Sequence, residues 1–398
     1  MPTEFVSGIS GRRDGFEAGS DAAGRAVEGM TADAVDFCQV FCSPHVDYRE
    51  ALEGVRSVIG DDPALIGCAA TGIFTEAERV DAGVGLAAVA SDRIEFQTGI
   101  GTGLSQSTQR AIRDARKGLT ESGDDLPYRS ALVLYDSLAS DGEELAQRIR
   151  RKLGARVPFA GGAASDDYRL ESTPVFCNDR IEEDAVVVAT LDSAAQAHVV
   201  DNHGHEPISE PVEVTSSEGR LVRELDGRPA FEVWKDAVRP HAAEMFDIDI
   251  DELERDDPLL RQMTAVFEFG IDQGETYKMR ACIDTDPEAG AMGALVNIPE
   301  GTRVAVMRGT VDSQIESART AARDAHAASG GAYAGAFVYD CACRDIILGE
   351  EFDTAVTEMR EVLDTPFVGF ETYGEMNMSF GRTSGFHNST TVISLLPE

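Results

Sequence analysis

A short apolar strand that runs into a glycine-containing turn occurs three times in the chain. The three segments are ALIGCAATGIF at 64–74, VPFAGGAASDD at 157–167 and TPFVGFETYGE at 365–375. An earlier apolar strand precedes each glycine by 25, 25 and 29 positions, counted from Cys42 to Gly67, from Asp136 to Gly161 and from Asp340 to Gly369. A helix–strand–helix–strand–turn–strand pattern repeated at this period predicts internal triplication, in units of roughly 70–85 residues.

The repeat predicts how the chain divides into domains. We expect a flexible N-terminus at 1–19 and a first domain at 20–207, which holds two repeat units at about 20–90 and 105–192. A second domain at 208–398 would hold a hairpin region at 208–311 and the third unit at 312–397. The predicted fold class is α+β, or mixed α/β, with mixed β-sheets flanked by helices in two domains.

The charge of the chain excludes some classes of partner. Asp and Glu number 71 against 35 Lys and Arg, which gives a net charge of −36 spread along 398 residues. Such a hydrated acidic surface is typical of halophilic proteins. Because phosphate groups are bound by basic surfaces, the charge argues against nucleic acid and against an anionic membrane as partners.

The cysteines and the apolar segments predict a cytoplasmic location. The seven cysteines are odd in number and irregularly spaced, and most lie in apolar runs. This pattern is typical of buried thiols in a reducing compartment rather than of a disulfide framework. No stretch approaches 18 apolar residues, and no apolar segment follows the pair Arg12–Arg13, so neither a membrane span nor an export signal is expected.

Arg344 is the best candidate for holding a ligand carboxylate, because its guanidinium can bind one with two hydrogen bonds. Asp340, Glu371 or Glu375 would then take an amino group, so that the set suits an amino acid. The alternative is an internal ion pair. Glycine turns at strand ends let backbone N–H groups approach a ligand. The full candidate ligand set is Arg344, Asp340, Cys341, Glu371, Tyr373, Glu375, His387, Asn388, Gly67, Cys68, Gly161, Gly162 and Asp166.

Other chemistry is possible for the same residue types. Cys341 or Cys343 with His387 would make a thiol nucleophile and its base. A C-x-C pair in a strand would point both thiols to one face, which also suits a metal, although no second cysteine pair completes such a site. The loop DNHGHEP, with His203 and His205, is interpreted as a solvent loop. We therefore predict neither a metal nor a cofactor.

The order of the motifs resembles that of the FIST family. LIGCAATG and VPFAGGAASDD, with the downstream NDRIEEDAVVVATL, resemble its N-terminal half. EGRLVRELDGRPAFEVW, FVYDCACRDIILG, VGFETYGEM and FHNSTTVISL resemble its C-terminal half, so that the resemblance covers about 35–395. It implies a sensory module of signal transduction that binds small ligands such as amino acids.

The expected function is therefore that of a free-standing, cytoplasmic sensor, since no attached signalling domain is recognisable. Its partners would be a small ligand and a downstream signalling protein. The alternatives are the thiol enzyme and an interaction scaffold without a ligand.

Overall fold

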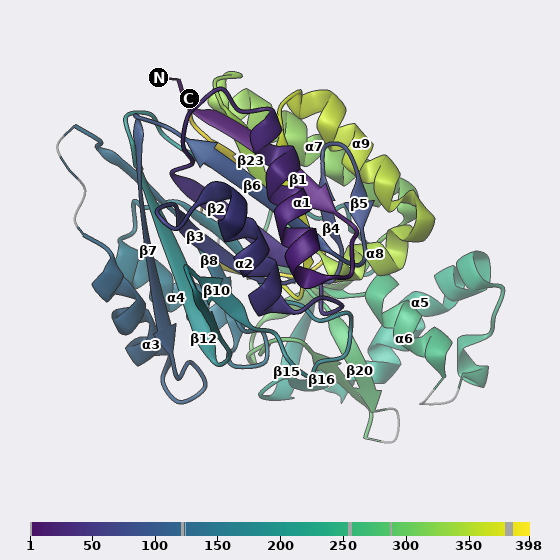
Figure 1. Cartoon of the computed structure of the whole chain (residues 1–398). Helices are drawn as coiled ribbons and strands as arrows, with labels where there is room; N and C mark the ends of the chain where they lie inside the picture. The colour runs from purple at the N-terminus through teal and green to yellow at the C-terminus, as the bar shows by residue number, and fades with distance from the viewer. Residues whose placement is uncertain (1, 121–122, 124, 254–256, 287–288, 379–384) are drawn as a thin grey trace.

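The structure is a computed structural model that describes residues 2–120, 123, 125–253, 257–286, 289–378 and 385–398. It shows three copies of one β–α–β–α–β unit, and a separate module inserted into the third copy (Figure 1). The units have the following elements.

The first unit consists of β1 (Glu4–Ser10), α1 (Gly15–Glu28), β2 (Phe37–Cys42), α2 (Tyr48–Ile59), β3 (Ala64–Ala69), β4 (Ile73–Thr75), β5 (Arg79–Val80) and β6 (Val84–Ala90). The second unit consists of β7 (Ile94–Thr102), α3 (Thr108–Ala115), β8 (Tyr128–Tyr135), α4 (Gly142–Leu153), β9 (Phe159–Ala163), β10 (Val175–Cys177), β11 (Arg180–Glu182) and β12 (Ala185–Ser193). The third unit consists of β13 (His198–Asn202), α7 (Val311–Ser329), β23 (Gly335–Cys341), α8 (Ala342–Leu348), α9 (Phe352–Leu363), β24 (Phe367–Thr372), β25 (Glu375–Met378), β26 (Gly385–His387) and β27 (Thr391–Leu396).

Each unit builds the same sheet. Its two central strands are parallel and joined by a helical crossover, as parallel strands require: β2 with β3, β8 with β9, and β23 with β24. The last strand of the unit pairs antiparallel with the first central strand, and the unit's opening strand pairs antiparallel with that last strand. The repeated glycines fall in one register, opposite a valine in every unit: Val40 with Gly67, Val133 with Gly161, and Val338 with Gly369. The predicted triplication is therefore confirmed.

The short hairpin of each unit leaves its own sheet. The first unit's β4–β5 pairs with β24 of the third unit. The second unit's β10–β11 pairs with β3 of the first, and the third unit's β25–β26 pairs with β9 of the second. The exchange is cyclic, so each of the three six-stranded sheets is completed by a neighbour.

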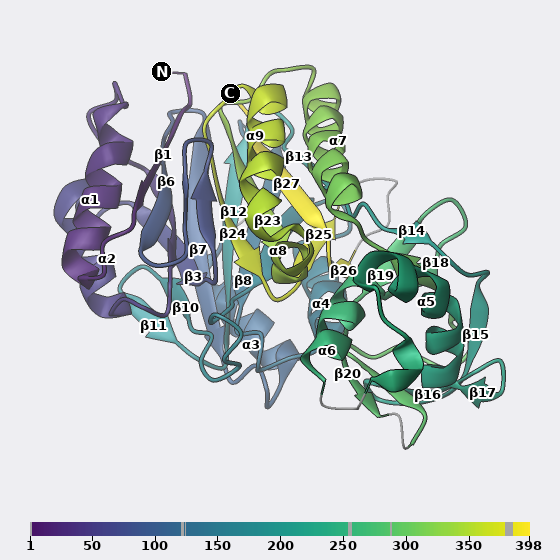
Figure 2. The same ribbon diagram turned by 90° about the vertical axis from the view of Figure 1, so that its right-hand side faces the viewer.

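Every sheet has one face towards a shared core and one face towards its own helices. The shared core draws buried side chains from all three units, including Phe41, Leu134 and Phe370. On the outer faces, α1 and α2 cover the first sheet, α3 and α4 the second, and α7 and α9 the third (Figures 1 and 2). The sequence explains where three of these helices begin. Asp14, Asp47 and Asp141 are N-caps whose side chains accept hydrogen bonds from backbone N–H groups of the first turn.

The inserted module joins β13 to α7 and lies at one end of the three-unit body (Figure 2). It consists of β14 (Glu206–Pro207), β15 (Val212–Glu218), β16 (Leu221–Leu225), β17 (Arg228–Pro229), α5 (Ala230–Phe246), α6 (Pro258–Val266), β18 (Phe269–Asp272), β19 (Tyr277–Arg280), β20 (Cys282–Asp286), β21 (Ala291–Ala294) and β22 (Arg303–Arg308). Its nine-stranded sheet and helices enclose a core of their own around Trp234. The predicted fold class, α+β with mixed sheets in two parts, is confirmed.

Three expectations about the chain's organisation are wrong. The N-terminus expected to be flexible at 1–19 contains β1, which pairs with β6 along its length, and the start of α1. The third unit begins at β13 rather than at 312, and it shares a core with the first two units in addition to its contacts with the hairpin region. Cys341 ends β23 and Cys343 lies in α8, so the C-x-C pair is not within one strand. The first two errors arise because strand pairing joins segments far apart in sequence.

Gly161→Ala tests the strand register that the three units share. An ideal Cβ on Gly161 would lie 1.8 Å from the carbonyl oxygen of Val133, so the paired strands must separate. We expect a loss of about 1–3 kcal/mol or more in the free energy of unfolding, measured by urea denaturation. Gly24→Ala is the matched control, because nothing lies within 4 Å of that Cβ in α1 and alanine should add about 0.5–1 kcal/mol. Equal effects of the two substitutions would contradict the close strand approach.

Candidate functional site

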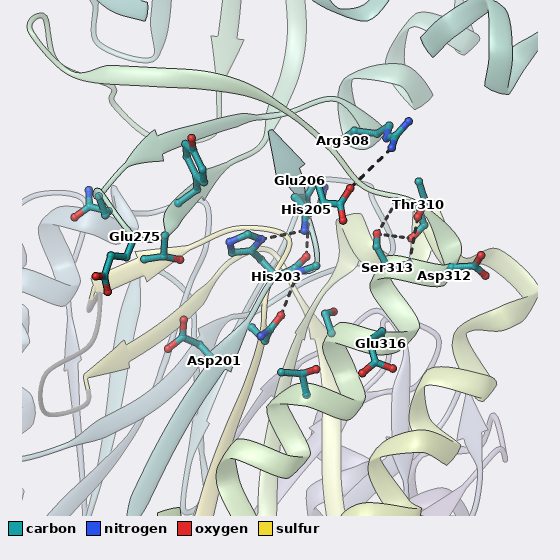
Figure 3. A pocket seen from close by; sticks show the side chains of 17 residues that line it. Asp201, His203, His205, Glu206, Glu275, Arg308, Thr310, Asp312, Ser313 and Glu316 are labelled. Atoms are coloured by element: carbon teal, nitrogen blue, oxygen red, sulfur yellow. Dashed lines mark hydrogen bonds and ion pairs between the residues drawn. The ribbon is translucent and has the colours of Figure 1, made fainter. Parts of the chain in front are cut away.

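A cavity of about 1110 Å³ opens where the chain leaves β13 for the module and where it returns to α7 (Figure 3). Its walls come from three segments, 201–206, 273–277 and 308–320. The first runs from the end of β13 to the start of β14, and the second is the turn between β18 and β19 with the first residue of β19. The third ends β22 and forms the first turns of α7. The cavity therefore lies at the junction between the three-unit body and the module.

Local sequence explains how the walls form. Gly204 has a φ of +65°, and an ideal Cβ there would lie 2.5 Å from the carbonyl oxygen of Ser313, so only glycine lets this loop pass close to α7. Thr310 is the N-cap of α7 and forms a capping box with Ser313. The polar start of a long helix is thereby fixed beside the loop that carries the two histidines.

Both histidines of this loop are neutral near pH 7. The backbone N–H of His205 donates to Nδ1 of His203 at 3.0 Å. Burial, with the nearby charge of Arg344, lowers the pKa of His203 to about 4. Burial, with His203 close by, lowers the pKa of His205 to about 3. His205 is only 5% exposed, so the interpretation of DNHGHEP as a solvent loop is wrong for this residue.

His205 is also held from the other side. Its Nδ1 lies 2.9 Å from the carbonyl oxygen of His203 and 3.1 Å from Nε2 of Gln314 in α7. Its Nε2 is buried and has no hydrogen-bond partner within the described part of the chain. The wall of the cavity therefore contains a polar nitrogen whose hydrogen-bonding capacity is unused.

Carboxylates dominate the charged groups that line the cavity. Its acidic residues are Asp201, Glu206, Glu275, Asp312 and Glu316. Arg308 lies among them, with its guanidinium 3.9 Å from the carboxylate of Glu206 (Figure 3). At neutral pH the cavity is thus strongly negative, since its histidines carry no charge.

Arg344, predicted to bind a ligand carboxylate, forms an internal pair instead. It is fully buried, and its Nε donates to Asp340 at 2.6 Å. Its remaining hydrogen bonds go to α7: to the side chain and carbonyl oxygen of Gln314, and to Ser317 Oγ at 2.7 Å. Ser317 lines the cavity, and Gln314 contacts His205. Arg344 therefore supports the wall of the cavity from behind.

His387 and Asn388 also lie behind this wall. Nε2 of His387 is 3.1 Å from Oδ1 of Asn377, whose amide donates to Asp201 of the cavity at 2.5 Å. Burial lowers the pKa of His387 well below its usual range. Oδ1 of Asn388 accepts from the backbone N–H of Ala281 in the module. Both predicted residues are buried structural contacts of the site rather than parts of its surface.

The two cysteines proposed as nucleophiles are not arranged for catalysis. Burial raises the pKa of Cys341 well above its usual range, so its thiol stays protonated. The hydrogen bond found for the His387 ring leads to Asn377 and not to a thiol. Cys343 is partly exposed, on α8. The geometry gives no support to the thiol-enzyme alternative.

The three glycine turns meet one another. The hydroxyl of Ser165 accepts from the backbone N–H of Thr71 at 2.8 Å and donates to the carbonyl oxygen of Glu371 at 2.5 Å. Asp166 accepts from the hydroxyl of Tyr373 and from three backbone N–H groups of its own loop, which hold its pKa below the usual range although burial opposes them. One hydroxyl thus joins turns from all three units.

The glycines of these turns allow close packing. Gly67 and Gly161 face carbonyl oxygens of the neighbouring strand, and Gly162 faces Thr372. Cys68 is buried in the shared core. These residues do not line the cavity at the module junction. Their positions favour the interpretation that the glycines permit tight turns.

The two predicted carboxylates Glu371 and Glu375 are buried as well. Arg79 donates to Glu371 at 2.9 Å, yet burial still raises the pKa of Glu371 to about 8. Glu375 accepts from the hydroxyl of Thr372 and from the backbone N–H of Thr390. Neither lines the cavity. The predicted ligand-binding residues therefore fall into two groups. Some lie in the interior of the three-unit body, and the others support the cavity wall.

Sequence reasoning missed the cavity residues Glu275, Arg308, Asp312 and Glu316, and it assigned His203 to a solvent loop. They come from three segments up to about a hundred positions apart, and none forms a recognised motif. One signal was available: the third unit has a long insertion where the first two have short connections between their opening strand and first helix. An insertion at a repeated connection marks a place where one copy differs in function.

Glu268 is a fully buried carboxyl at the base of the module. Ser389 Oγ donates to its Oε1 at 2.6 Å, whereas its Oε2 has no partner among the residues that the structure describes. Burial raises the pKa of Glu268 to about 8, against the effect of that hydrogen bond. The group is therefore protonated in the folded state at pH values where it is ionised in the unfolded chain.

Two comparisons place the chain among known proteins. Residues 36–228 match the FIST N domain, and residues 230–378 match the FIST C domain. The boundary between the two matches falls within the inserted module, after β16. The cavity therefore takes 201–206 from the first matched region and its other two segments from the second.

Relatives of similar length occur in mycobacteria. An uncharacterised protein of Mycobacterium bovis is 25% identical over 98% of both chains, and one of Mycobacterium tuberculosis is 24% identical over 98% of this chain and 99% of its own. An uncharacterised protein of Methanocaldococcus jannaschii is 23% identical over 50% of this chain, and the match spans 40% of that protein. These organisms do not support the halophilic source expected from the charge.

In the residues that the structure describes, no helix combines the length and the apolar character needed to cross a membrane.

Arg344→Met tests whether the buried pair is structural. The substitution leaves Asp340 buried without its cation and removes the donors to Gln314 and Ser317. We expect a loss of about 3–5 kcal/mol in the free energy of unfolding, measured by urea denaturation. Arg148→Met is the matched control, because it breaks a surface ion pair with Glu144 that is worth about 1 kcal/mol or less. A loss no greater than that of the control would contradict a structural role.

Glu268→Gln tests the buried proton. Between about pH 5 and 8 the folded protein keeps a proton on Glu268 that the unfolded chain releases, so its contribution to stability falls as the pH rises. The variant has an amide in place of the carboxyl group and cannot ionise at this position. Its stability relative to the wild type should therefore rise with pH, by up to about 1.4 kcal/mol per unit. Urea denaturation at several pH values measures the difference, and a difference independent of pH would contradict the raised pKa.

Proposed function

Because the chain belongs to the FIST family, whose domains are generally sensory domains of signal transduction, we propose that it senses a small molecule bound in the cavity at the module junction. The observation that carries this proposal is the composition of the cavity wall. Segments of the three-unit body and of the module line it together. A bound molecule contacts both parts at once, so it can favour one arrangement of them over another.

We propose an amino acid as the ligand. The guanidinium of Arg308 and the N-terminal turn of α7 are groups that attract a carboxylate. The acidic side chains around them suit an amino group. Arg308 thus takes the role that the sequence suggested for Arg344, whose hydrogen bonds go to the protein interior.

A sensory domain of signal transduction passes its signal to another protein. We therefore propose a cytoplasmic signalling protein as the partner. The thiols support the cytoplasmic location: the seven cysteines are free, and six of them are buried. Free thiols in this number are typical of proteins from reducing compartments.

Ligand binding to the native chain should raise its melting temperature, because only the folded state binds. The test is thermal denaturation with a panel of amino acids and other small metabolites. Thr320→Trp fills the cavity from α7 and should abolish the shift. Thr354→Trp, at an exposed position of α9, is the matched control and should retain it. A shift that survives in Thr320→Trp, or the absence of a shift with every compound, would overturn the proposal.

A further inference from the structure

We propose that pH controls how firmly the hairpin β4–β5 is held on the third unit's sheet, through a cluster of Arg79, Asp81, Asp345 and Glu371. The hairpin is held while Glu371 carries a proton, and it opens more readily as that proton is lost. We call these four residues the Arg79 cluster. The first unit contributes this hairpin to the third, so the control acts on the exchange of strands and is independent of the ligand of the cavity.

One arginine serves three carboxyl groups in this cluster. The guanidinium of Arg79 in β5 lies 2.7 Å from the carboxyl of Glu371 in β24 and 2.8 Å from that of Asp345 in α8. Asp81 lies 3.4 Å away and is 84% exposed, so water screens its charge. The side chain of Asp345 is only 23% exposed, and that of Glu371 is fully buried. If both are ionised, this inner part of the cluster has one more negative than positive charge, which is costly away from water.

The carboxyl of Glu371 is enclosed and only half satisfied. Its Oε1 accepts from Arg79, whereas its Oε2 is buried and has no hydrogen-bond partner within the described residues. An ideal Cβ on Gly72, just before β4, would lie 1.9 Å from Oε1, so only glycine leaves room for the carboxyl beneath the hairpin. A buried anionic oxygen without a donor costs free energy. The closed hairpin therefore favours the protonated form of Glu371.

The pKa values agree with this geometry. Burial raises the pKa of Glu371 from 4.5 to about 8, although Arg79 opposes the change. Burial also raises the pKa of Asp345, again against the effect of Arg79. The closed cluster thus keeps a proton near pH 7 that a hydrated carboxyl would release.

Within the described part of the chain, the other titratable groups that face the cluster do not neutralise it. They are Asp340 of β23, Tyr168 of the loop after β9, and Cys341 and Cys343 at the start of α8. Asp340 adds a further carboxyl, which is paired with Arg344. Burial raises the pKa values of Tyr168 and Cys341, so both stay neutral. From α9 comes the uncharged ring of Phe352, 4.7 Å from the guanidinium carbon.

Opening of the hairpin removes the cover from Glu371. β4 and β5 form one edge of the third unit's sheet, and β4 pairs with β24 through three residues (Figure 1). With Gly72 and Arg79 lifted away, the carboxyl meets water and releases its proton at an ordinary pH. The closed state then binds one proton more than the open state. By linkage, the free energy of opening falls as the pH rises from about 5 to 8, and it levels off above the pKa of the closed state.

Hydrogen exchange of residues 73–80 tests this proton-dependent opening. It is measured by mass spectrometry on the full chain between about pH 5 and 8 and corrected for the intrinsic exchange rate at each pH. We expect the protection of the hairpin to fall by up to about tenfold for each pH unit. Glu371→Gln is neutral at every pH and should abolish this dependence. A wild-type protection that does not change with pH would overturn the proposal, as would a dependence that survives in Glu371→Gln.

Glu268→Gln is the matched control for local opening. It removes another buried carboxyl with a pKa of about 8, which bonds to Ser389 and not to the hairpin. Global unfolding releases the protons of both carboxyls, whereas local opening of the hairpin releases only that of Glu371. The control should therefore leave the pH dependence of the hairpin unchanged. If both substitutions reduce it equally, the hairpin exchanges only by global unfolding and the proposal fails.

Asp345→Asn gives a second test at a partly exposed position, where folding is less at risk than at Glu371. With this carboxylate removed, Arg79 is left to Glu371, which can then ionise inside the closed hairpin. The hairpin of this variant should stay protected at about pH 8, at which the wild type has lost protection. A pH dependence equal to that of the wild type would show that the shared arginine does not set the response, and it would overturn the proposal.

Discussion

The exchange of hairpins among the three units is the constraint on which the rest of the structure depends. No unit completes its own sheet: β3 pairs with β10, β9 with β25 and β24 with β4. An isolated unit would leave the backbone groups of a central strand without partners, and it would expose one face of its sheet. The shared core and the meeting of the three turns at Ser165 follow from the same exchange. We therefore expect the three units to fold cooperatively, whereas the module has a core of its own outside this exchange.

The insertion in the third unit gives the body its asymmetry. The module is attached by buried charges, since Lys278 and Arg280 of β19 both contact Glu143 of α4, at 2.7 and 2.8 Å. Buried ion pairs add little net stability but require one geometry, because a displaced partner leaves an uncompensated charge. The cavity lies beside this interface. Its walls are consequently held in place by directional contacts rather than by apolar packing alone.

The sequence allowed the repeat to be predicted because each unit repeats a local signal. Gly67, Gly161 and Gly369 occupy one position of the fold, and the strands that precede them lie where the apolar runs predict. The exchange of hairpins could not be predicted, because the sequences of short strands such as β4 and β25 do not indicate which sheet each strand joins. Long-range pairing of this kind also orders β1, which lies in the N-terminal segment that we expected to be flexible.

The candidate site was predictable only in part, for a related reason. Arg344 was predicted to hold a ligand carboxylate, with an internal ion pair as the alternative, and the structure shows the internal pair. The sequence could not decide between the two, because the groups that face the guanidinium come from the distant helix α7. Asp340 stands four residues before Arg344 and proves to be its partner. The cavity residues lie on three distant segments, and each alone resembles an ordinary polar loop. Only the length of the insertion distinguished this place in the chain.

The hydrogen bond between Asp201 and Asn377 joins two different sheets. Asp201 lies in β13, at the edge of the third unit's sheet, whereas Asn377 lies in β25, which the third unit lends to the second unit's sheet. A molecule that contacts Asp201 therefore touches two sheets through one side chain. The position of Asp201 is therefore coupled to both sheets through the hairpin that the third unit contributes to the second unit's sheet.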